Sequence, residues 1–197
     1  MNNLSEANNV NVTIDKKEQE KIWWYVNKCP KEISGLGKVV VKDDGTLHVR
    51  KIYLLNQEVS GSETELDDDA VATLLYESHQ DEGSLMFWWH SHVNMGVFWS
   101  GTDHEAIRKL GANGMVLSTV YNKKGEHRTS LYMAADSWRP SVFVDNLSLR
   151  IAPELSQDET ATLESEYGSK VKEAKLNTFP SYAGTYNGAK PKITPKV

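Results

Sequence analysis

The sequence predicts an α/β fold in which helices cover a β-sheet, and three observations lead to this. Segments with alternating apolar residues, typical of strands, are interspersed with amphipathic segments of helical spacing. Asp43-Asp44-Gly45, between two strand patterns, is typical of a hairpin turn. The apolar run Leu85 to Trp89 is typical of a buried strand. Strands with helices before, between and after them indicate a layered α/β domain.

Each element is predicted from its own pattern. Ile22, Tyr25 and Val26 recur at helical spacing within residues 16–28, and Pro30 ends this predicted helix. Strands are predicted over residues 36–42, 46–55, 85–92, 115–121, 128–134 and 142–151. Further helices are predicted over residues 70–79, 100–110 and 158–176, and residues 57–65 are predicted to be a polar loop.

The order of these patterns predicts the domain organisation. Residues 1–12 are polar and Asn-rich, which is typical of a disordered segment. Residues 13–155 hold the predicted strands and are expected to form one folded domain, and residues 156–178 a C-terminal helix. Residues 179–197 are rich in Gly, Pro and Lys, so we expect a flexible tail.

Composition narrows the classes of function. The formal net charge of −5 argues against nucleic acid as the partner. No stretch approaches the roughly 20 apolar residues of a membrane helix, so no membrane association is expected. Cys29 is the single cysteine, which excludes an internal disulfide and a thiolate zinc cluster. The N-terminus lacks the features of a signal peptide, and the expected location is the cytoplasm.

Two histidines lie one residue apart at the end of the apolar strand, in His90-Ser91-His92. Residues two apart in a strand share a face, so both imidazoles point the same way. Seven residues later Ser100 begins the next predicted helix, and Asp103 falls in its first turn. Two imidazoles and one carboxylate suit zinc and leave a fourth position for water. With a single carboxylate the metal remains a strong Lewis acid.

This spacing resembles the JAMM motif of the JAB/MPN metallopeptidases, which is His-(Ser/Thr)-His, seven residues, Ser, two residues and Asp. That family also has an upstream glutamate in a Pro-x-Glu-x-x-Gly context. Pro30 to Gly35 matches it, directly after the predicted first helix. The resemblance covers residues 16–131 and is to stand-alone prokaryotic or viral members. It implies an MPN-like α-β-α layered domain with a curved mixed sheet, flanking helices and a flexible C-terminal tail.

The resemblance also implies a role for each motif residue. His90, His92 and Asp103 would bind one zinc ion per chain. Glu32 would take a proton from the attacking water and pass it to the leaving amine, and Ser100 would hydrogen-bond the oxyanion. The implied reaction is hydrolysis of a peptide or isopeptide bond in a protein or peptide substrate, a ubiquitin-like conjugate among them.

Several residues have a second interpretation. Ser100 and Asp103 are also typical of a helix capping box, and the two roles are compatible because the cap fixes where the carboxylate points. Glu58 is an alternative general base. Phe98 and Trp99 are candidates for a substrate groove. His104 is expected to point away from the ligands, because its side chain is turned by about 100° from that of its neighbour on a helix.

The function itself also has alternatives. Val93 and Trp99 stand where many JAB/MPN members have proline, so the loop between the motif halves is differently stiffened and more aromatic. An MPN-type scaffold, or a viral or bacterial assembly factor that binds rather than cleaves, is the alternative to a peptidase. A zinc nucleoside deaminase is excluded, because that site needs a pair of cysteines.

Overall fold

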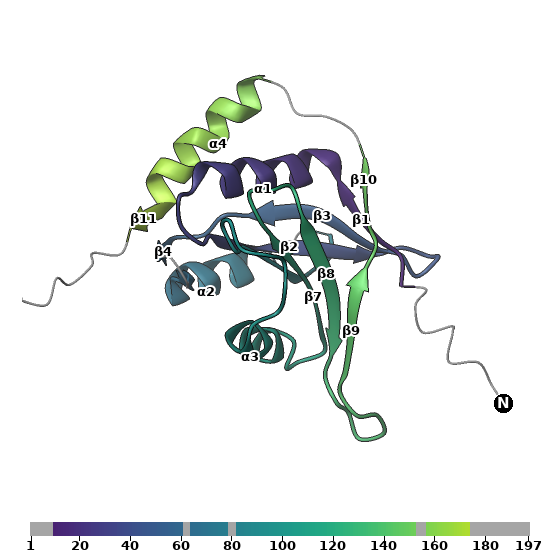
Figure 1. Cartoon of the computed structure of the whole chain (residues 1–197). Coiled ribbons are helices and arrows are strands. Elements are labelled where there is room, and N and C mark those ends of the chain that lie inside the picture. Colours follow the sequence, from purple (N-terminus) through teal and green to yellow (C-terminus); the bar gives the residue numbers. More distant parts are fainter. Residues whose placement is uncertain (1–9, 61–63, 79–81, 153–156, 174–197) are drawn as a thin grey trace, which may run out of the picture.

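A curved mixed β-sheet forms the centre of the molecule, which confirms the α/β prediction (Figure 1). The computed structural model describes residues 10–60, 64–78, 82–152 and 157–173. The eight strands of the main sheet have the order β10-β1-β3-β2-β6-β7-β8-β9. The two edge strands, β9 and β10, are separated in the chain by Ser148 alone. The sheet therefore curves until its edges nearly meet.

The elements have the following bounds. The main sheet consists of β1 (Val12–Asp15), β2 (Ser34–Val41), β3 (Leu47–Tyr53), β6 (Ser84–Ser91), β7 (Met115–Tyr121), β8 (His127–Met133), β9 (Val142–Leu147) and β10 (Leu149–Ala152). A second sheet, ordered β11-β4-β5, consists of β4 (Gln57–Val59), β5 (Thr64–Leu66) and β11 (Val171–Glu173). The helices are α1 (Lys16–Lys28), α2 (Asp68–Glu77), α3 (Gly101–Leu110) and α4 (Gln157–Lys170).

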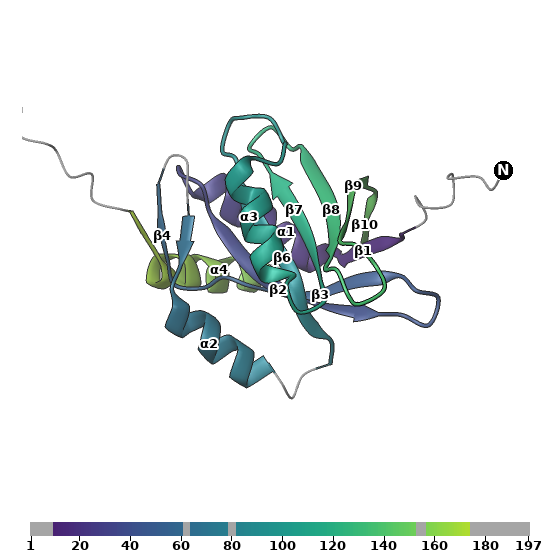
Figure 2. The same ribbon diagram turned by 90° about the horizontal axis from the view of Figure 1, so that it is seen from below.

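The hydrophobic core has two parts, one on each face of the main sheet. Strand β6 contributes side chains to both, because its side chains alternate between the two faces. Phe87 and Trp89 pack with α1, where the indole of Trp89 stacks on the ring of Tyr25 at 6.1 Å between centroids. Trp88 packs on the other face with Ile107 of α3. Figures 1 and 2 show α1 and α4 on one side of the sheet and α2 and α3 on the other. The sheet thus separates the helices into two layers.

Most predicted elements are confirmed to within two residues of their ends. The first helix spans Lys16–Lys28 as predicted, and it ends because Cys29 is extended (ψ 125°) before Pro30. The Asp43-Asp44-Gly45 hairpin is also confirmed, with β2 and β3 antiparallel around it. Among the described residues no helix is long and apolar enough to cross a bilayer.

Two predictions about the N-terminal half were wrong. The predicted polar loop 57–65 instead includes β4 and the first two residues of β5, which pair as an antiparallel hairpin. Gln57 and Val59 are buried and alternate with exposed Glu58, as in a strand. The predicted disordered segment 1–12 includes Val12, which begins β1 and is buried. Buried Val12 and Ile14 alternate with half-buried Thr13 and Asp15, which is the two-residue period of a strand. Residues 1–9 lie outside the described part of the chain.

Two predictions about the C-terminal half also need correction. The single strand predicted over 142–151 is divided at Ser148 into β9 and β10. Asn146 adopts a left-handed conformation (φ 57°) where the register between β8 and β9 shifts, one residue before β9 ends at Leu147. The helix predicted over 158–176, in the C-terminal helical segment 156–178, ends at Lys170. Val171–Glu173 form β11 instead, which pairs in parallel with β4. The flexible tail predicted for residues 179–197 lies outside the described residues.

Candidate metal centre

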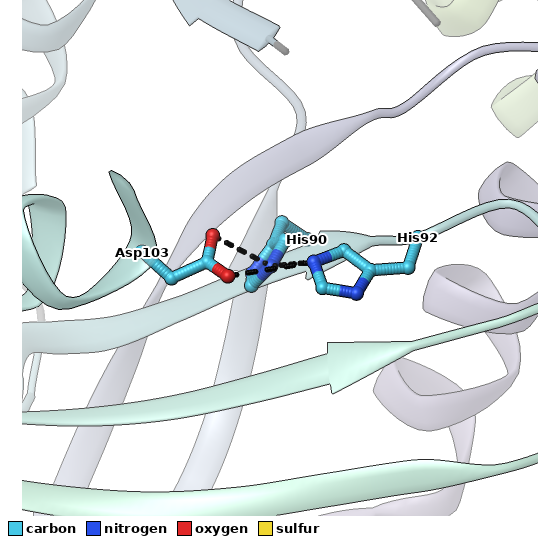
Figure 3. A group of neighbouring side chains, drawn as sticks. All are labelled: His90, His92 and Asp103. Carbon is cyan, nitrogen blue, oxygen red and sulfur yellow. Dashed lines mark hydrogen bonds and ion pairs between the residues drawn. The ribbon is translucent and has the colours of Figure 1, made fainter. Parts of the chain in front are cut away.

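The two histidines and the aspartate singled out from the sequence lie together (Figure 3). His90 Nε2 lies 3.2 Å from His92 Nε2 and 3.1 Å from Asp103 Oδ1. His92 Nε2 lies 3.4 Å from Asp103 Oδ2. The exposed fractions of the three residues are 2%, 4% and 8%. Ligand-type atoms of all three side chains therefore converge at one buried point.

The spacing of these atoms fits a metal ion of the size of zinc. Such an ion binds nitrogen and oxygen at about 2.0–2.1 Å, and tetrahedral angles then hold its ligand atoms roughly 3.3 Å apart. The measured separations range from 3.1 to 3.4 Å. The two imidazole nitrogens are therefore at the separation that a tetrahedral ion requires, and each has one oxygen of Asp103 at a similar distance.

The N-terminus of α3 fixes the direction of the Asp103 carboxylate. Asp103 Oδ2 accepts a hydrogen bond from the Ser100 amide (2.7 Å), and Ser100 Oγ accepts one from the Asp103 amide (3.1 Å). This reciprocal pair is a capping box. The carboxylate thus satisfies the helix terminus and faces the two imidazoles at the same time, so the two sequence interpretations of this pair coexist.

Each imidazole is oriented by a different neighbour. His92 Nδ1 lies 3.2 Å from the Gly96 carbonyl oxygen, which can only accept, so Nδ1 carries a proton and Nε2 is the ring nitrogen that a metal could bind. The ring of His90 instead stacks on Trp88, with centroids 4.3 Å apart and planes at 14°. His90 Nδ1 is buried and has no hydrogen-bond partner among the described residues. In both rings Nε2 faces the shared point.

The electrostatics of the cluster favour an ionised carboxylate. Burial would raise the pKa of Asp103, but hydrogen bonds from His90 and His92 and from the Ser100 amide hold it well below its usual range. Burial lowers the pKa of His90, so its neutral form is favoured. Burial would also lower the pKa of His92, but contacts with Asp103, Gly96 and the charge of Glu32 raise it.

Glu32 lies on the same side of the sheet as the histidines. In the antiparallel pairing of β2 with β6, Ser34 is opposite His90. The Ser91 amide donates to the Ile33 carbonyl (2.9 Å), so the pairing continues beyond β2 and Glu32 comes opposite His92. Glu32 is buried, at 6% exposure, and lines the same cavity as the three candidate ligands.

Gly35, the last residue of the Pro-x-Glu-x-x-Gly match, is required by close packing. A Cβ atom at this position would lie 2.4 Å from the Tyr53 carbonyl oxygen and 2.6 Å from the indole of Trp89. No side chain fits there without displacement of backbone. The glycine therefore lets β2 lie close to β3 and β6, which sets the position of the Glu32 segment.

The β4–β5 hairpin forms another wall of the site, and sequence reasoning missed it. The buried side chain of Gln57 accepts a hydrogen bond from the Ser34 amide (3.0 Å) and donates to the Ser34 carbonyl (2.9 Å). The Glu32 amide donates to the Ser60 carbonyl (3.0 Å). The hairpin is thereby fastened to the start of β2, and Thr64 of β5 lines the cavity. A short polar segment carries no sequence signal for this contact.

The cavity at the site has a volume of about 160 Å³. Its lining residues are Glu32, Thr64, Trp88, His90, His92, Met95, Phe98, Ser100, Thr102, Asp103 and Ala106. Phe98, one of the two groove candidates, is 46% exposed at this cavity. Trp88 could have been identified from the sequence, because it shares a strand face with His90.

The other candidates from the sequence lie elsewhere. Trp99 does not line the cavity; its Nε1 donates to Asp145 Oδ1 (3.0 Å) and its ring lies against His90. His104 packs against Phe143, 4.9 Å between ring centroids, so it points away from the ligands as expected. Glu58 is exposed on β4 and lines a different cavity.

Comparison with known proteins shows the fold alone. No family model matches the chain, and no curated protein matches it. The structure is similar to the solution structure of protein DSY2949 from Desulfitobacterium hafniense, with a TM-score of 0.52 and 15% sequence identity. The match covers 76% of this chain and 97% of that chain. It agrees with the mixed α/β architecture described above.

Proposed function

We propose that the chain is a zinc-dependent metallopeptidase of the JAB/MPN class that hydrolyses a peptide or isopeptide bond. The observation that carries the proposal is the convergence of His90, His92 and Asp103 on one buried point. The cavity at that point is also lined by Glu32 and Ser100, the two residues that the JAMM motif assigns to proton transfer and oxyanion binding. The substrate class is a protein or peptide, with ubiquitin-like conjugates as the first candidates.

The donor set supports zinc as the metal. Two imidazole nitrogens and one carboxylate are borderline to hard ligands, a combination common in catalytic zinc sites, and three protein ligands leave one coordination position open. The hydrogen bond from His92 Nδ1 to Gly96 leaves Nε2 free to bind. Zinc held there would act as a Lewis acid on the scissile carbonyl and on a water molecule.

Glu32 is the proposed general base and acid. Its carboxylate takes a proton from water as the oxygen attacks the carbonyl carbon, and gives it to the amide nitrogen as the C–N bond breaks. Its burial at 6% exposure and its electrostatic effect on His92 support this role, because both put the carboxylate beside the metal site. A general base of this kind typically contributes about 10²- to 10⁴-fold to the rate.

Ser100 is the proposed oxyanion donor. Its Oγ accepts the hydrogen bond from the Asp103 amide, which leaves its own hydroxyl hydrogen available to donate. The oxyanion of the tetrahedral intermediate would receive that hydrogen bond. Loss of one such donor typically lowers the rate by about 10²- to 10³-fold.

The rim of the cavity supports binding of an extended, partly apolar chain. Met95 and Phe98 are each 46% exposed, and Phe98 lies 4.8 Å from the ring of His92. Trp88 and Ala106 form the apolar wall beneath. A polypeptide bound across Met95 and Phe98 would exclude bulk water from the reacting carbonyl.

Two measurements test the proposal. Wild-type protein should hold about one equivalent of zinc per chain, and His90→Ala, His92→Ala and Asp103→Ala should each lose it. Glu32→Gln should retain the zinc and lose turnover by about 10²-fold or more, assayed on linked ubiquitin-like chains and on peptides. Glu58→Gln is the matched control, because Glu58 is an exposed acid outside the cavity, and it should retain both zinc and turnover.

The outcomes separate the peptidase from the alternatives. If the ligand variants hold as much zinc as wild type, the metal assignment is wrong. If the wild type binds zinc but no substrate is cleaved, or if Glu32→Gln is as active as wild type, the peptidase mechanism is wrong. A zinc-binding scaffold or assembly factor would then be the better description.

A further inference from the structure

We propose that Asn122 is a positioning residue that orients His92 for metal binding, an inference that rests on the proposed function. Asn122 is the first residue of the turn between β7 and β8, and it is fully buried, at 0% exposure. Its Nδ2 donates to the Met95 carbonyl (2.8 Å), 27 residues earlier in the chain. Met95 lies in the loop of residues 93–99, which connects the histidines to α3.

The contact reaches His92 through a short series of hydrogen bonds. The Met95 carbonyl belongs to the same peptide unit as the Gly96 amide, so Asn122 fixes the plane of that unit. The Met95 amide donates to the His92 carbonyl (2.8 Å). The next carbonyl, that of Gly96, accepts from His92 Nδ1 (3.2 Å). Asn122 thus holds the segment that selects the His92 tautomer.

The loop needs such support because it leaves β6 in an unfavourable conformation. Val93, directly after His92, has a φ of 49°, which is rare for a β-branched residue and persists only where contacts impose it. The Val93 carbonyl accepts a hydrogen bond from the Lys123 amide (2.6 Å). The β7–β8 turn therefore holds the loop through two hydrogen bonds, one from the Lys123 backbone amide and one from the Asn122 side chain.

A second turn in the molecule shows that the turn itself does not require Asn122. In the β2–β3 turn, the Lys42 amide donates to Thr46 and the Gly45 amide to Lys42, at 2.9 and 2.8 Å. The β7–β8 turn has the same two bonds, at 3.1 and 3.3 Å, and its glycine has a φ of 84° against 81° for Gly45. An exposed lysine occupies the first position in one turn and a buried asparagine in the other. Asp44 Oδ1 accepts from the Thr46 amide in the first turn, and Asn122 Oδ1 accepts from the Glu126 amide in the second. What Asn122 adds is its Nδ2, which donates to the Met95 carbonyl and to the Glu126 carboxylate.

The informative variant is Asn122→Asp. The aspartate keeps an oxygen that accepts from the amides of Lys124 and Glu126, as Asn122 Oδ1 does at 3.0 Å, but it cannot donate to Met95. We expect a roughly 10-fold or greater loss of zinc affinity, measured by competition with a chromophoric chelator. In metal-free protein, ¹⁵N NMR of the His92 ring should change from one Nδ1-protonated tautomer to a mixture.

The controls separate positioning from turn stability and from charge. Asp44→Ala removes the side-chain bond to the Thr46 amide in the other turn, and it should change neither zinc affinity nor the His92 spectrum. Asn122→Asp combined with Glu126→Gln removes the repulsion between the two carboxylates and should stay weak in zinc binding. Asn122→Ala repeats the comparison without an added charge.

The proposal is overturned if folded Asn122→Asp and Asn122→Ala have a wild-type His92 spectrum and zinc affinity within about 2-fold of wild type. It is also overturned if the double variant regains wild-type affinity, because charge repulsion would then explain the loss. If wild type itself binds no zinc, the proposed function fails. The NMR comparison in metal-free protein still decides whether Asn122 orients His92.

Discussion

His90 and His92 are two residues apart and face the same point, yet different forces hold them. His90 is the second-last residue of the central strand β6, and its ring lies against Trp88 and Trp99, with ring centroids 4.3 and 5.9 Å away. His92 lies just beyond the strand, and its Nδ1 is held by the Gly96 carbonyl. The pKa of His90 is lowered by burial, whereas that of His92 is raised by its hydrogen bonds.

The difference shows that one motif can combine two kinds of preorganisation. Packing holds a ring through many weak contacts, each of about 0.1–0.2 kcal/mol, so its orientation depends on the shape of the core. A hydrogen bond holds a ring through one directional contact, so its orientation depends on the conformation of a loop. Changes in the core should therefore affect His90 first, and changes in the loop should affect His92 first.

The largest expected effect on stability comes from Trp88→Leu, which removes the ring stacked on His90. Trp88 is 7% exposed, so the cavity left behind should lower the free energy of unfolding by about 2–3 kcal/mol. Zinc affinity should fall by about 10-fold or more, because His90 loses its orientation. Urea unfolding and chelator competition measure the two effects.

Trp138→Leu is the matched control for this change. Trp138 is 92% exposed in the β8–β9 connection, so its removal should change the free energy of unfolding by less than about 0.5 kcal/mol. Zinc affinity should be unchanged. In Trp88→Leu the NMR signals of the His92 ring should still indicate a proton on Nδ1. Loss of that signal would contradict the separation of the two histidines.

The part of the site that the sequence predicts is the part built by local geometry. Strand periodicity puts His90 and His92 on one face, and the first helical turn confines Asp103, so a stretch of 14 residues from 90 to 103 defines the three candidate ligands. Glu32 was predicted from its motif context. Its place opposite His92 follows from the β2–β6 register, which the sequence does not specify.

The other residues that line or support the site are placed by contacts between distant segments of the chain, so the sequence alone does not predict them. Thr64 reaches the cavity because Gln57 bonds the backbone of β2, and the segment around them has no apolar periodicity beyond two residues. Asn122 is indistinguishable in sequence from an ordinary turn residue, since Asn-Lys-Lys-Gly predicts a turn and nothing more. Its role depends on the Met95 carbonyl, which the fold alone brings near.

Ser100→Ala should have an intermediate effect on stability, and it tests what the two histidines share. Both contact Asp103, whose direction the Ser100 cap helps to fix. Loss of the cap should cost about 1 kcal/mol of stability. Zinc should be retained, because the Ser100 amide still donates to Asp103 Oδ2. Turnover should fall by about 10²- to 10³-fold through loss of the oxyanion donor. A variant that loses zinc in proportion to activity would assign Ser100 to metal positioning alone.

The smallest expected effect on stability comes from Asp145, which holds Trp99 against His90, and it depends on pH. Asp145 accepts hydrogen bonds from Trp99 Nε1 (3.0 Å) and from the guanidinium of Arg128 (2.6 and 3.0 Å). Partial burial would raise the pKa of Asp145, but these bonds outweigh it and lower the pKa. A lowered folded-state pKa stabilises the protein above the unfolded pKa of about 3.9, and this stabilisation is lost as the pH falls through the folded value.

Asp145→Asn should therefore be less stable than wild type at pH 7 by about 0.5–1 kcal/mol, a modest value because the pair is about one-third exposed and screened by solvent. The difference in stability between wild type and Asp145→Asn should narrow as the pH falls below about 4, because the carboxylate is then protonated first in the unfolded chain and, at lower pH, in the folded protein. Asp136→Asn is the control, because Asp136 forms a similar pair with Arg139 in an exposed loop and, within the described part of the chain, bonds only to that loop. Urea unfolding at pH 7 and at lower pH measures how much less stable each variant is than wild type. The NMR signals of the His90 ring should broaden in Asp145→Asn alone. If the difference in stability between wild type and Asp145→Asn stays constant with pH, the Asp145 charge does not hold Trp99 over His90.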